Sequence, residues 1–408
     1  RTSPVQVPAL TDARAVSAGA QHALAVLEDS TLWSWGGNAD GQVGDGVVDW
    51  QLLPVRSGFA ASRGLSTAYQ YSLNIALDGS AQGTGANGSG QLGDGSVLNR
   101  ALPVASVGLT DCRAIASGHG HALALKTDGR IYAWGSNQEG TLGDGTTVSR
   151  ALPTLIPSPV GVLSIAVGSR HSLALLGDGT VQSWGSNLQG QLGDATVVSR
   201  TSPVRVQGLT GVAAIAAGEG FSLALKYDGT VWAWGSNSLG QLGDGSTTKQ
   251  WVPVQTQGLT GVTSISAGRT HALALKGDGT LWGWGSNAYG ELGDGTQVRK
   301  LLPVQVSSVT GVVTLDAGEH HSLAVTTGGK VWSWGRNQHG QLGSGVKSNW
   351  RLLPAQVAGL TGALAVGAGG EHSLAVLSDR SVWAWGNSNV GQLGTGLSNV
   401  RAAPVRVW

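Results

Sequence analysis

The chain has 408 residues with 25 basic and 24 acidic side chains, and this balance gives no electrostatic footprint for nucleic acid or for an anionic membrane. A single Cys, Cys112, excludes an intrachain disulfide framework and a thiolate metal cluster. No apolar run approaches the ~20 residues that a membrane-spanning helix needs. We therefore expect neither nucleic acid nor a membrane as a partner.

The chain consists of eight copies of one motif, written most fully at residues 232–245 as Trp-Ala-Trp-Gly-Ser-Asn-Ser-Leu-Gly-Gln-Leu-Gly-Asp-Gly. Successive copies lie 49 to 51 residues apart, and no linker separates them. Such regularity predicts one repeat domain over residues 1–408. Its repeats run roughly over 8–57, 58–106, 107–156, 157–206, 207–256, 257–306, 307–357 and 358–408.

The Pro-containing strand of the motif occurs nine times, once more than the other predicted strands. Pro4–Val7 precedes the first repeat, and Pro404–Val407 ends the last one. A ring of sheets avoids exposed edges only if its last sheet is complete. We expect the two end segments to lie close together and to compete for one strand position, and the sequence leaves open which of them closes the ring.

Repeat 2 departs furthest from the pattern. It has Tyr71 at the usual His position, and its third strand, Ala81–Gly85, contains neither of the usual Trp residues. Because those side chains normally fill the space between neighbouring units, we expect looser packing here. Drift in one tolerant repeat explains the departure, and a functional slot between units is the alternative.

Repeat 5 shows four strand signals most clearly. Alternating apolar runs at 213–217, 221–226 and 230–234 precede a Pro-containing run at 253–256. Asp228-Gly229 between the second and third runs is a strong hairpin signal. Four strands per unit of about 50 residues predict an all-β fold, a single closed β-propeller of eight four-stranded blades.

The pattern Ala-Gly-x-x-His-Ser-Leu-Ala-Leu, followed by Asp-Gly-x-Val-Trp-x-Trp-Gly-x-Asn-x-x-Gly-Gln-Leu-Gly, resembles the repeat of the regulator of chromosome condensation family. The resemblance covers nearly the whole chain and implies a β-propeller with these strands as blades. Members of that family usually have seven blades. Because this chain has eight copies, we expect eight blades, with seven as the alternative.

A His recurs before the second strand of six repeats and suggests a metal-binding ring at first sight. Two repeats have Tyr71 or Phe221 there, which indicates a residue that packs and hydrogen-bonds at the start of a strand. The Trp before the first Gly of the motif is interpreted likewise, as packing between blades with its N–H satisfied. We therefore predict no metal and no cofactor at these positions, namely His22, His121, His171, His271, His321 and His372.

A basic residue stands three positions before the Pro of six repeats. In four of them an Asp lies six residues upstream, and we predict ion pairs across a turn, each worth about 0 to 1 kcal/mol. Arg351 and Arg401 lack this Asp and are better candidates for contact with an anionic partner. The predicted pairs are Arg100–Asp94, Arg150–Asp144, Arg200–Asp194 and Lys300–Asp294.

Two residues between the repeat Gly and the His position vary from repeat to repeat, whereas their surroundings are nearly constant. A constant scaffold with variable tips is how repeat proteins present a binding surface. Tyr and Arg are enriched in binding hot spots, so Tyr69, Arg170 and Arg269 are the expected anchors. The whole predicted partner-binding set is Tyr69, His119, Arg170, Glu219, Arg269, Glu319, His320 and Glu371.

An alternative binding surface is the set of long turns before the Pro strands, which we expect on the opposite face of the ring. Trp50, Trp251 and Trp350 lie in these turns. Large aromatic side chains are themselves frequent anchors of protein interfaces. The two surfaces therefore remain alternatives at this point.

Repeat 7 concentrates four ionisable groups: Asp316, Glu319, His320 and His321. Asp316 lies on a strand where other repeats have small residues, so its carboxylate must be solvated by the channel or paired. An enzyme or metal protein with a site at the channel mouth, or a small-molecule ligand there, is the competing hypothesis. No ligand spacing supports it, and we predict no catalytic residue and no metal.

Relatives in the family that the chain resembles include exchange factors for small GTPases, a plant ultraviolet receptor and a secreted bacterial β-lactamase inhibitor. The short repeats leave no room for the wedge of an exchange factor, and there is neither a basic tail nor the receptor's Gly-Trp-Arg-His-Thr motif. The resemblance then implies a bacterial-type propeller that binds or inhibits another protein. A secreted or cell-surface location is expected, with a cytoplasmic one as the alternative, since Arg1 and the absence of Met suggest a processed chain.

Overall fold

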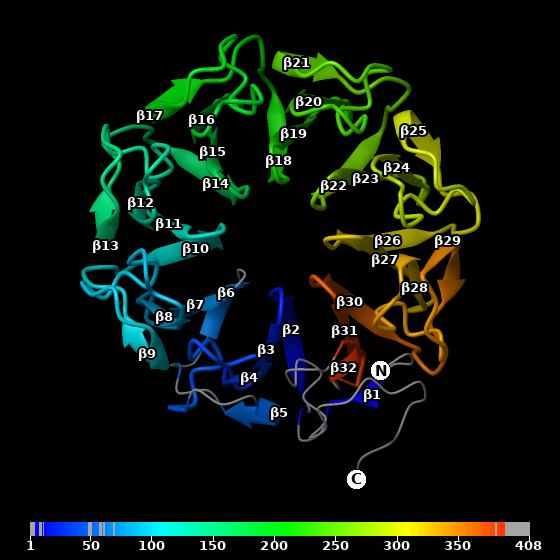
Figure 1. Cartoon of the computed structure of the whole chain (residues 1–408), viewed down its shortest axis with the longest axis horizontal. Helices are drawn as coiled ribbons and strands as arrows, with labels where there is room; N and C mark the ends of the chain where they lie inside the picture. The colour runs from blue at the N-terminus through cyan, green and yellow to red at the C-terminus, as the bar shows by residue number, and fades with distance from the viewer. Residues whose placement is uncertain are drawn as a thin grey trace.

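The computed structural model describes residues 5–7, 10, 12–47, 51–56, 59, 62–67, 70–379 and 382–387. Over these residues the chain forms eight antiparallel four-stranded sheets around a central channel (Figure 1). The all-β propeller with eight blades is therefore confirmed, and the seven-bladed alternative is wrong. This part of the chain contains no helix long and apolar enough to cross a membrane.

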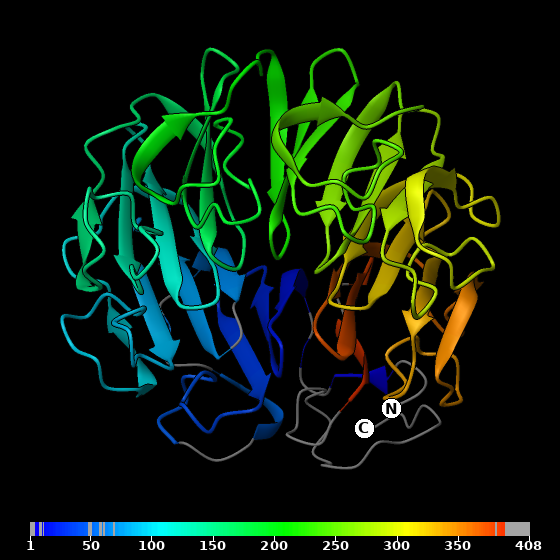
Figure 2. The same ribbon diagram turned by 45° about the horizontal axis from the view of Figure 1, so that its top comes forward.

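The first strand of each blade lies nearest the channel, and the fourth lies at the outer circumference, as the turned view in Figure 2 also shows. The first strands are β2 (Ala13–Ala18), β6 (Ser62–Thr67), β10 (Cys112–Ser117), β14 (Val162–Val167), β18 (Val212–Ala217), β22 (Val262–Ala267), β26 (Val312–Ala317) and β30 (Ala363–Ala368). The fourth strands are β5 (Gln51–Arg56), β9 (Arg100–Ala105), β13 (Arg150–Leu155), β17 (Arg200–Arg205), β21 (Gln250–Gln255), β25 (Lys300–Gln305), β29 (Trp350–Gln356) and β1 (Val5–Gln6).

The second and third strands of each blade form the predicted hairpin. In repeat 5 the Asp228 carboxylate accepts a hydrogen bond from the Thr230 N–H at 2.9 Å, and Gly229 has a φ of 77° that suits the turn. The second strands are β3 (His22–Leu27), β7 (Tyr71–Ala76), β11 (His121–Lys126), β15 (His171–Leu176), β19 (Phe221–Lys226), β23 (His271–Lys276), β27 (His321–Thr326) and β31 (His372–Leu377). The third strands are β4 (Leu32–Gly36), β8 (Ala81–Gly85), β12 (Ile131–Gly135), β16 (Val181–Gly185), β20 (Val231–Gly235), β24 (Leu281–Gly285), β28 (Val331–Arg336) and β32 (Val382–Gly386).

The N-terminal strand completes the last blade. β1 pairs antiparallel with β32, with Val5 opposite Ala384 and Gln6 opposite Trp383. This pairing settles which terminal strand occupies the position in this structure. Pro4 and residues 404–407 lie outside the described residues, so the expected proximity of the two end segments stays a prediction.

The hydrophobic core lies between blades. Seven Trp side chains are fully buried there, and each cluster joins two neighbouring blades, as Leu173 and Leu175 of blade 4 do with Trp234 of blade 5. The indole N–H of Trp234 donates to the carbonyl of Gln191 at 2.8 Å, and five of the others donate to the equivalent carbonyl. Packing between blades with a satisfied N–H is thus confirmed for six of the seven, whereas Trp35 Nε1 has no hydrogen-bond partner within the described residues. The seven are Trp35, Trp134, Trp184, Trp234, Trp284, Trp334 and Trp385.

The Gly residues of the motif allow each loop to approach the outer strand of the next blade. Gly240 has a φ of 81°, and a Cβ there would lie 2.7 Å from a side-chain carbon of Leu301 and 2.8 Å from the carbonyl of Lys300. Gly245 N–H donates to the Leu301 carbonyl at 2.8 Å. The glycines are therefore required both by conformation and by close backbone contact.

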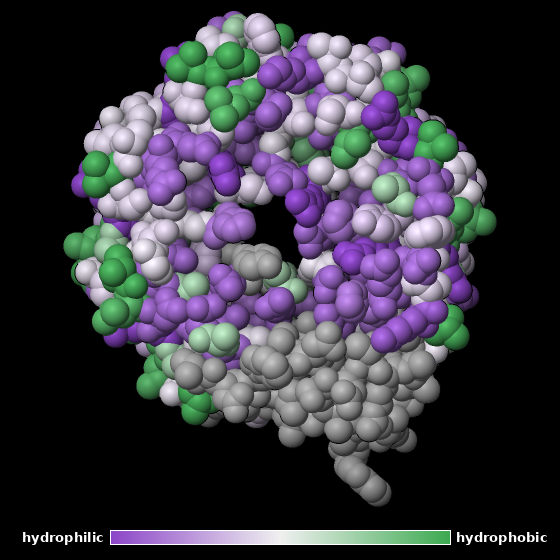
Figure 3. All heavy atoms as spheres, in the orientation of Figure 1, coloured by the Kyte–Doolittle hydropathy of each residue, from purple (hydrophilic) through white to green (hydrophobic). Residues whose placement is uncertain are grey.

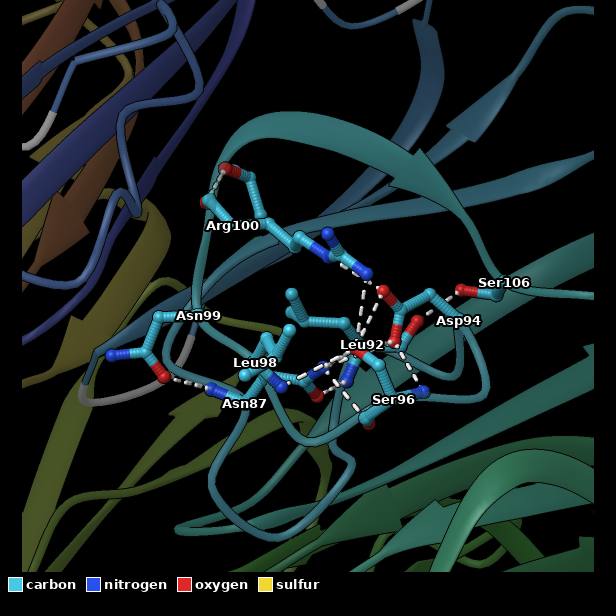
Figure 4. Close-up of polar contacts among 9 residues, drawn as sticks. Asn87, Leu92, Asp94, Ser96, Leu98, Asn99, Arg100 and Ser106 are labelled. Carbon is cyan, nitrogen blue, oxygen red and sulfur yellow. Dashed lines mark hydrogen bonds and ion pairs between the residues drawn. The ribbon is translucent and has the colours of Figure 1, made fainter.

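An Asn–Asp–Arg network fixes the loop that follows the motif (Figure 4). Asn87 Nδ2 donates to Asp94 Oδ1 at 3.0 Å, and its Oδ1 accepts from the Leu92 N–H at 2.9 Å. Burial opposes ionisation of Asp94, but hydrogen bonds from Ser96 and Arg100 outweigh it and lower the pKa of that carboxyl. The four predicted ion pairs are confirmed: Arg100–Asp94 at 2.7 Å, Arg150–Asp144 at 2.9 Å, Arg200–Asp194 at 2.6 Å and Lys300–Asp294 at 2.8 Å.

Blade 2 differs from the other blades at the position of the buried Trp. Thr84 replaces the buried Trp, and its hydroxyl lies 2.6 Å from the carbonyl oxygen of Gly41 and 2.7 Å from that of Arg100. A cavity of about 180 Å³ lies between the first two blades, lined by residues that include Arg14, Val16, Val26, Gly64 and Leu65. Thr84 is not among the residues that line this cavity, so looser packing at the position of the missing Trp stays a prediction.

Candidate functional site

The turns between first and second strands surround one mouth of the channel, and we call this end of the ring the tip face. The mouth holds a cavity of about 560 Å³, lined mostly by Gly and small residues at these turns. Figure 3 shows the central opening, with hydrophilic residues along much of its visible rim. Among the described lining residues, the ionisable ones are His119, Glu219, Arg269 and Glu319.

Four of the eight predicted site residues therefore come together at the mouth. Arg170, His320 and Glu371 occupy the second tip position, and their side chains contact loops of the preceding blades. Tyr69 lies outside the described residues. The predicted set thus consists of a group at the mouth and a group at the seams between blades.

Ion pairs join the tips of blades 5, 6 and 7. Arg269 Nε lies 2.8 Å from Glu219 Oε2, and Arg269 Nη1 lies 2.9 Å from Glu319 Oε1. The hydrogen bond with Glu219 raises the pKa of Arg269 further. Since the three side chains belong to three consecutive blades, they hold neighbouring tips in a fixed relation.

Arg170 forms a separate pair on blade 4. Its Nη1 lies 3.0 Å from Glu139 Oε1, which belongs to the long loop of blade 3. The Arg170 side chain is 71% exposed, so most of its surface stays open to solvent. An exposed pair of this kind adds little to stability and leaves the guanidinium free to contact a partner.

A buried carboxylate lies beneath the tip of blade 7. Glu291 is fully buried, and its Oε1 lies 3.8 Å from His320 Nδ1, while its Oε2 accepts from the Tyr289 N–H at 2.9 Å. Burial opposes ionisation of Glu291, but His320 and the neighbouring backbone outweigh it and lower the pKa of this carboxyl. The rings of Tyr289 and His320 lie 5.1 Å apart, so aromatic contact also joins blades 6 and 7.

Glu371 connects the tip of blade 8 to the loop of blade 7. It lies 3.5 Å from Arg336 Nη1 and 3.4 Å from His339 Nε2, and it accepts a hydrogen bond from Asn387 Nδ2 at 2.8 Å. The guanidinium of Arg336 lies 5.4 Å from the ring centre of Tyr289. Burial lowers the pKa of His339, although the charge of Glu371 opposes this effect.

The four ionisable groups of repeat 7 do not form one site. Asp316 accepts hydrogen bonds from the Ala317 N–H at 3.0 Å and the Ala368 N–H at 2.9 Å, so it is paired, and burial raises its pKa. His321 Nε2 lies 2.9 Å from Ser373 Oγ, while Glu319 and His320 contact Arg269 and Glu291. Over the described residues, no three His, Cys, Asp or Glu side chains form a group that could hold a metal ion.

The recurring His side chains are structural. Each is buried, and in five seams its Nε2 bonds to a Ser of the next blade, as in His121–Ser172 at 3.0 Å. Ser172 Oγ then donates to the Thr141 carbonyl at 3.1 Å. Burial lowers the pKa of all six imidazoles to about 3 or 4. The other bonded pairs are His22–Ser72, His171–Ser222, His271–Ser322 and His321–Ser373.

The expectation that the long turns lie on the opposite face is wrong. His271 pairs with Gly285, and Gly285 pairs with Lys300, so the second strand starts at the same end of the blade as the fourth. Alternating strand direction in an antiparallel sheet requires this. Trp251 and Trp350 therefore lie on the tip face, nearer the circumference, and Trp50 lies outside the described residues.

Sequence reasoning missed Tyr289, Glu291, Arg336 and His339 as neighbours of the tips. A signal was present, because Glu291 replaces a residue that is Gln in most repeats. Arg336 likewise replaces Ser, Gly, Ala or Asn. These departures show their significance only when the loop of one blade is placed against the tip of the next.

The chain is similar to several proteins of determined structure. Prp20p from Saccharomyces cerevisiae is similar at 24% identity over 87% of this chain and 90% of that chain, with a TM-score of 0.68. Human WBSCR16 is similar at 23% identity over 86% of this chain and 97% of that chain, with a TM-score of 0.69. Yeast RCC1 (Prp20) bound to Kap60 gives 23% identity, 90% coverage of each chain and a TM-score of 0.68.

At these identities the structural comparisons show the fold alone. No curated protein sequence matches the chain. The model of the RCC1-like domain matches residues 1–286 and 83–408, and the two matches overlap and together span the whole sequence. The chain therefore belongs to the RCC1-like domain family.

Proposed function

We propose that this chain is a protein-binding propeller that recognises another protein with its tip face. The observation that carries the proposal is the contrast between fixed turns and variable side chains. In blade 5 the Gly218 N–H donates to the Phe221 carbonyl at 2.9 Å, and in blade 4 the Gly168 N–H donates to His171 in the same way at 3.0 Å. Because such tips are already ordered, they lose little conformational entropy on binding.

Similar structures support a protein as the class of partner. Prp20p has binding properties toward Gsp1p and histones, and yeast RCC1 (Prp20) is bound to Kap60 in a second structure. The balanced charge of the present chain offers no footprint for nucleic acid or for a membrane surface. We therefore extend only the general property, recognition of a protein, to this chain.

The anchors of the interface are proposed to be Tyr69, Arg170 and Arg269, joined by Tyr289 and Arg336. Tyr and Arg are enriched in hot spots because they combine apolar contact with directed hydrogen bonds. Ion pairs with Glu139 and Glu219 orient the side chains of Arg170 and Arg269. The contact between the Arg336 guanidinium and the Tyr289 ring orients these two side chains. His119, Glu219, Glu319, His320 and Glu371 complete the proposed contact set.

Photo-crosslinking tests which face binds. A photoreactive residue replaces Ser169 on the tip face in one variant and Thr127, in the turn at the other end of the blade, in a second. Each is incubated with extract of the source cells, and adducts are identified by mass spectrometry. We expect one specific protein adduct from position 169 and none from position 127. The reverse pattern would overturn the proposal.

Once a partner is identified, matched Arg variants test the anchors. Arg170→Ala combined with Arg269→Ala should weaken binding at least about tenfold, because hot-spot truncations typically cost over 1 kcal/mol each. Arg130→Ala is the control, since Arg130 is also exposed and paired but lies in the turn at the other end of the blade. Equal affinity of the double variant and the wild type would exclude these residues as anchors.

A further inference from the structure

Two segments of this chain carry the sequence of a complete fourth strand for the same position. Residues 1–7 read Arg-Thr-Ser-Pro-Val-Gln-Val, and residues 401–407 read Arg-Ala-Ala-Pro-Val-Arg-Val. Residues 200–206, which contain the fourth strand of blade 4, read Arg-Thr-Ser-Pro-Val-Arg-Val. Both end segments therefore resemble a strand whose seated form the structure shows.

Residues 5–7, the described part of the N-terminal segment, are placed like an ordinary fourth strand. In blade 4, Val204 lies opposite Ser183 and Arg205 opposite Gln182. In blade 8, Val5 and Gln6 lie opposite Ala384 and Trp383, the equivalent positions of β32. Val7 is fully buried, as is Val206 of blade 4. The C-terminal residues that correspond to Val5, Gln6 and Val7 are Val405, Arg406 and Val407. Blade 4 has Arg205 at the middle one of these positions, so an Arg fits there.

Chain length allows either segment to reach the position. The spacing from Gly386 to Pro404 equals the spacing from Gly185 to Pro203 in blade 4. The spacing from Pro4 to Ala13, where β2 starts, likewise equals that from Pro203 to Val212. The number of residues between β32 and the C-terminal segment is therefore the usual one for this fold. The number of residues between the N-terminal segment and blade 1 is also the usual one.

We propose that the edge of β32 is a docking site that accepts residues 401–407 in exchange for residues 1–7. Only one segment fits at a time, because β32 has one free edge once β31 is paired. Backbone hydrogen bonding along the edge supplies affinity, and pockets for alternate side chains supply register, as in strand addition generally. The ring thus has two closing strands for one position.

The exchange changes how blade 8 is held to blade 1. With β1 paired to β32, the sheet of blade 8 contains backbone that continues into blade 1. With residues 401–407 seated, blade 8 is completed by its own chain, and its sheet no longer contains backbone that leads into blade 1. The seam between blades 8 and 1 also differs in its polar contacts. Neither ring nitrogen of His372 has a hydrogen-bond partner within the described residues, whereas the His of five other seams bonds to a Ser.

Disulfide trapping tests which segment is seated. Directly opposed strand residues lie within the Cα separation that a disulfide requires, and the one native Cys is buried. Val5→Cys with Ala384→Cys reports the N-terminal segment, and Val405→Cys with Ala384→Cys reports the C-terminal one. The control is Val405→Cys with Ala133→Cys, because Ala133 is the equivalent residue of blade 3 and Thr154 already lies opposite it. Disulfide yield is measured by mass spectrometry of the full chain after mild oxidation.

We expect disulfides from both Ala384 pairs and none from the Ala133 control. Deletion of residues 1–7 should raise the yield of the Val405–Ala384 disulfide, since the competitor is removed. Absence of that disulfide in the deletion variant, with the Val5–Ala384 disulfide formed in the full chain, would overturn the exchange. Equal yields from the Ala384 and Ala133 partners of Val405 would overturn it as well.

Deletions supply a second measurement that does not depend on cysteine placement. Removal of residues 1–7 alone, or of residues 401–408 alone, leaves one segment to fill the position, so each melting temperature should fall only slightly. Removal of both exposes the edge of β32 and should lower the melting temperature by more than the two single effects together. Strictly additive effects would contradict two segments that share one site.

Discussion

At the scale of single residues, seven of the eight seams between blades contain a matched pair of side chains. Where the next blade supplies Ser, the preceding residue is His, and the two bond, as His171 and Ser222 do at 2.9 Å. Ala122 and Ala272 offer no hydroxyl, and the residues before them are Tyr71 and Phe221. Tyr71 instead donates to the His121 carbonyl at 2.7 Å, and Phe221 needs no partner. The aromatic replacements thus follow from the loss of the Ser.

One seam breaks this rule and gives a prediction in two directions. His372 corresponds to Ala23 in blade 1, so Ala23→Ser should provide a partner for its Nε2 and raise stability by about 0.5 to 1.5 kcal/mol. Ser172→Ala should leave His121 without its partner and cost about 1 to 3 kcal/mol. Urea unfolding of both variants measures the two effects. Destabilisation by Ala23→Ser would show that the seam has no room for the hydroxyl.

At the scale of elements, the blades are joined by buried Trp side chains and by loops that contact the next outer strand. Trp234 is fully buried, whereas Trp232 on the same strand is partly exposed and lies beneath Lys226 at 5.5 Å. Residues two positions apart on a strand lie on the same face, so both side chains face blade 4 and belong to one cluster. Trp234 is a buried member of this cluster, whereas Trp232 packs against it and keeps part of its surface in water.

The two Trp residues give a matched pair of substitutions. Trp234→Ala should destabilise the ring by about 3 to 5 kcal/mol, because it removes a buried ring and the bond to the Gln191 carbonyl. Trp232→Ala should cost clearly less, since part of its surface is already in water. Denaturant midpoints of both variants provide the comparison. Similar costs at the two positions would contradict the greater contribution expected from the fully buried Trp234.

The loop contacts give a second matched pair. Gly240 and Gly208 both have positive φ values, 81° and 69°, but a Cβ at Gly240 meets the outer strand of the next blade, whereas one at Gly208 meets nothing within 4 Å. Gly240→Ala should therefore cost about 1 to 3 kcal/mol more than Gly208→Ala, which carries the backbone strain alone. Thermal unfolding distinguishes them. Equal losses would mean that conformation, not contact between blades, selects the glycine.

At the scale of the whole molecule, six buried neutral imidazoles make the ring sensitive to acid. Burial lowers each folded-state pKa from 6.5 to about 3 or 4, so the unfolded chain binds more protons between those values. Stability is therefore complete above the unfolded pKa and is lost as the pH falls below it. At pH 5 each His removes about 2 kcal/mol, and six together approach the whole stability of a typical domain.

We accordingly predict a steep fall of the melting temperature between pH 7 and pH 5. His171→Phe combined with Ser222→Ala copies the natural pair Phe221–Ala272 and removes one titrating group. In this variant the pH dependence of the unfolding free energy should decrease by about 1.4 kcal/mol per pH unit below pH 6. An unchanged pH dependence of the unfolding free energy would show that the buried His residues do not control stability in acid.

The sequence by itself determined the fold. A regular period, an Asp-Gly turn such as Asp228-Gly229 and alternating apolar runs are local signals, and local signals specify strands, hairpins and the number of blades. The same contrast of constant and variable positions located the tips. Four of the predicted residues, His119, Glu219, Arg269 and Glu319, do meet at the channel mouth.

Only the tertiary structure decided which side chains meet across seams and which face each turn occupies. Arg269 lies between Glu219 and Glu319, and Arg336 lies between Tyr289 and Glu371, because the ring brings together residues about 50 positions apart or from different loops. No local pattern encodes those distances. The closing strand was undecided for the same physical reason: residues 1–7 and 401–407 have equivalent local sequences, and only the pairing of β1 with β32 distinguishes them.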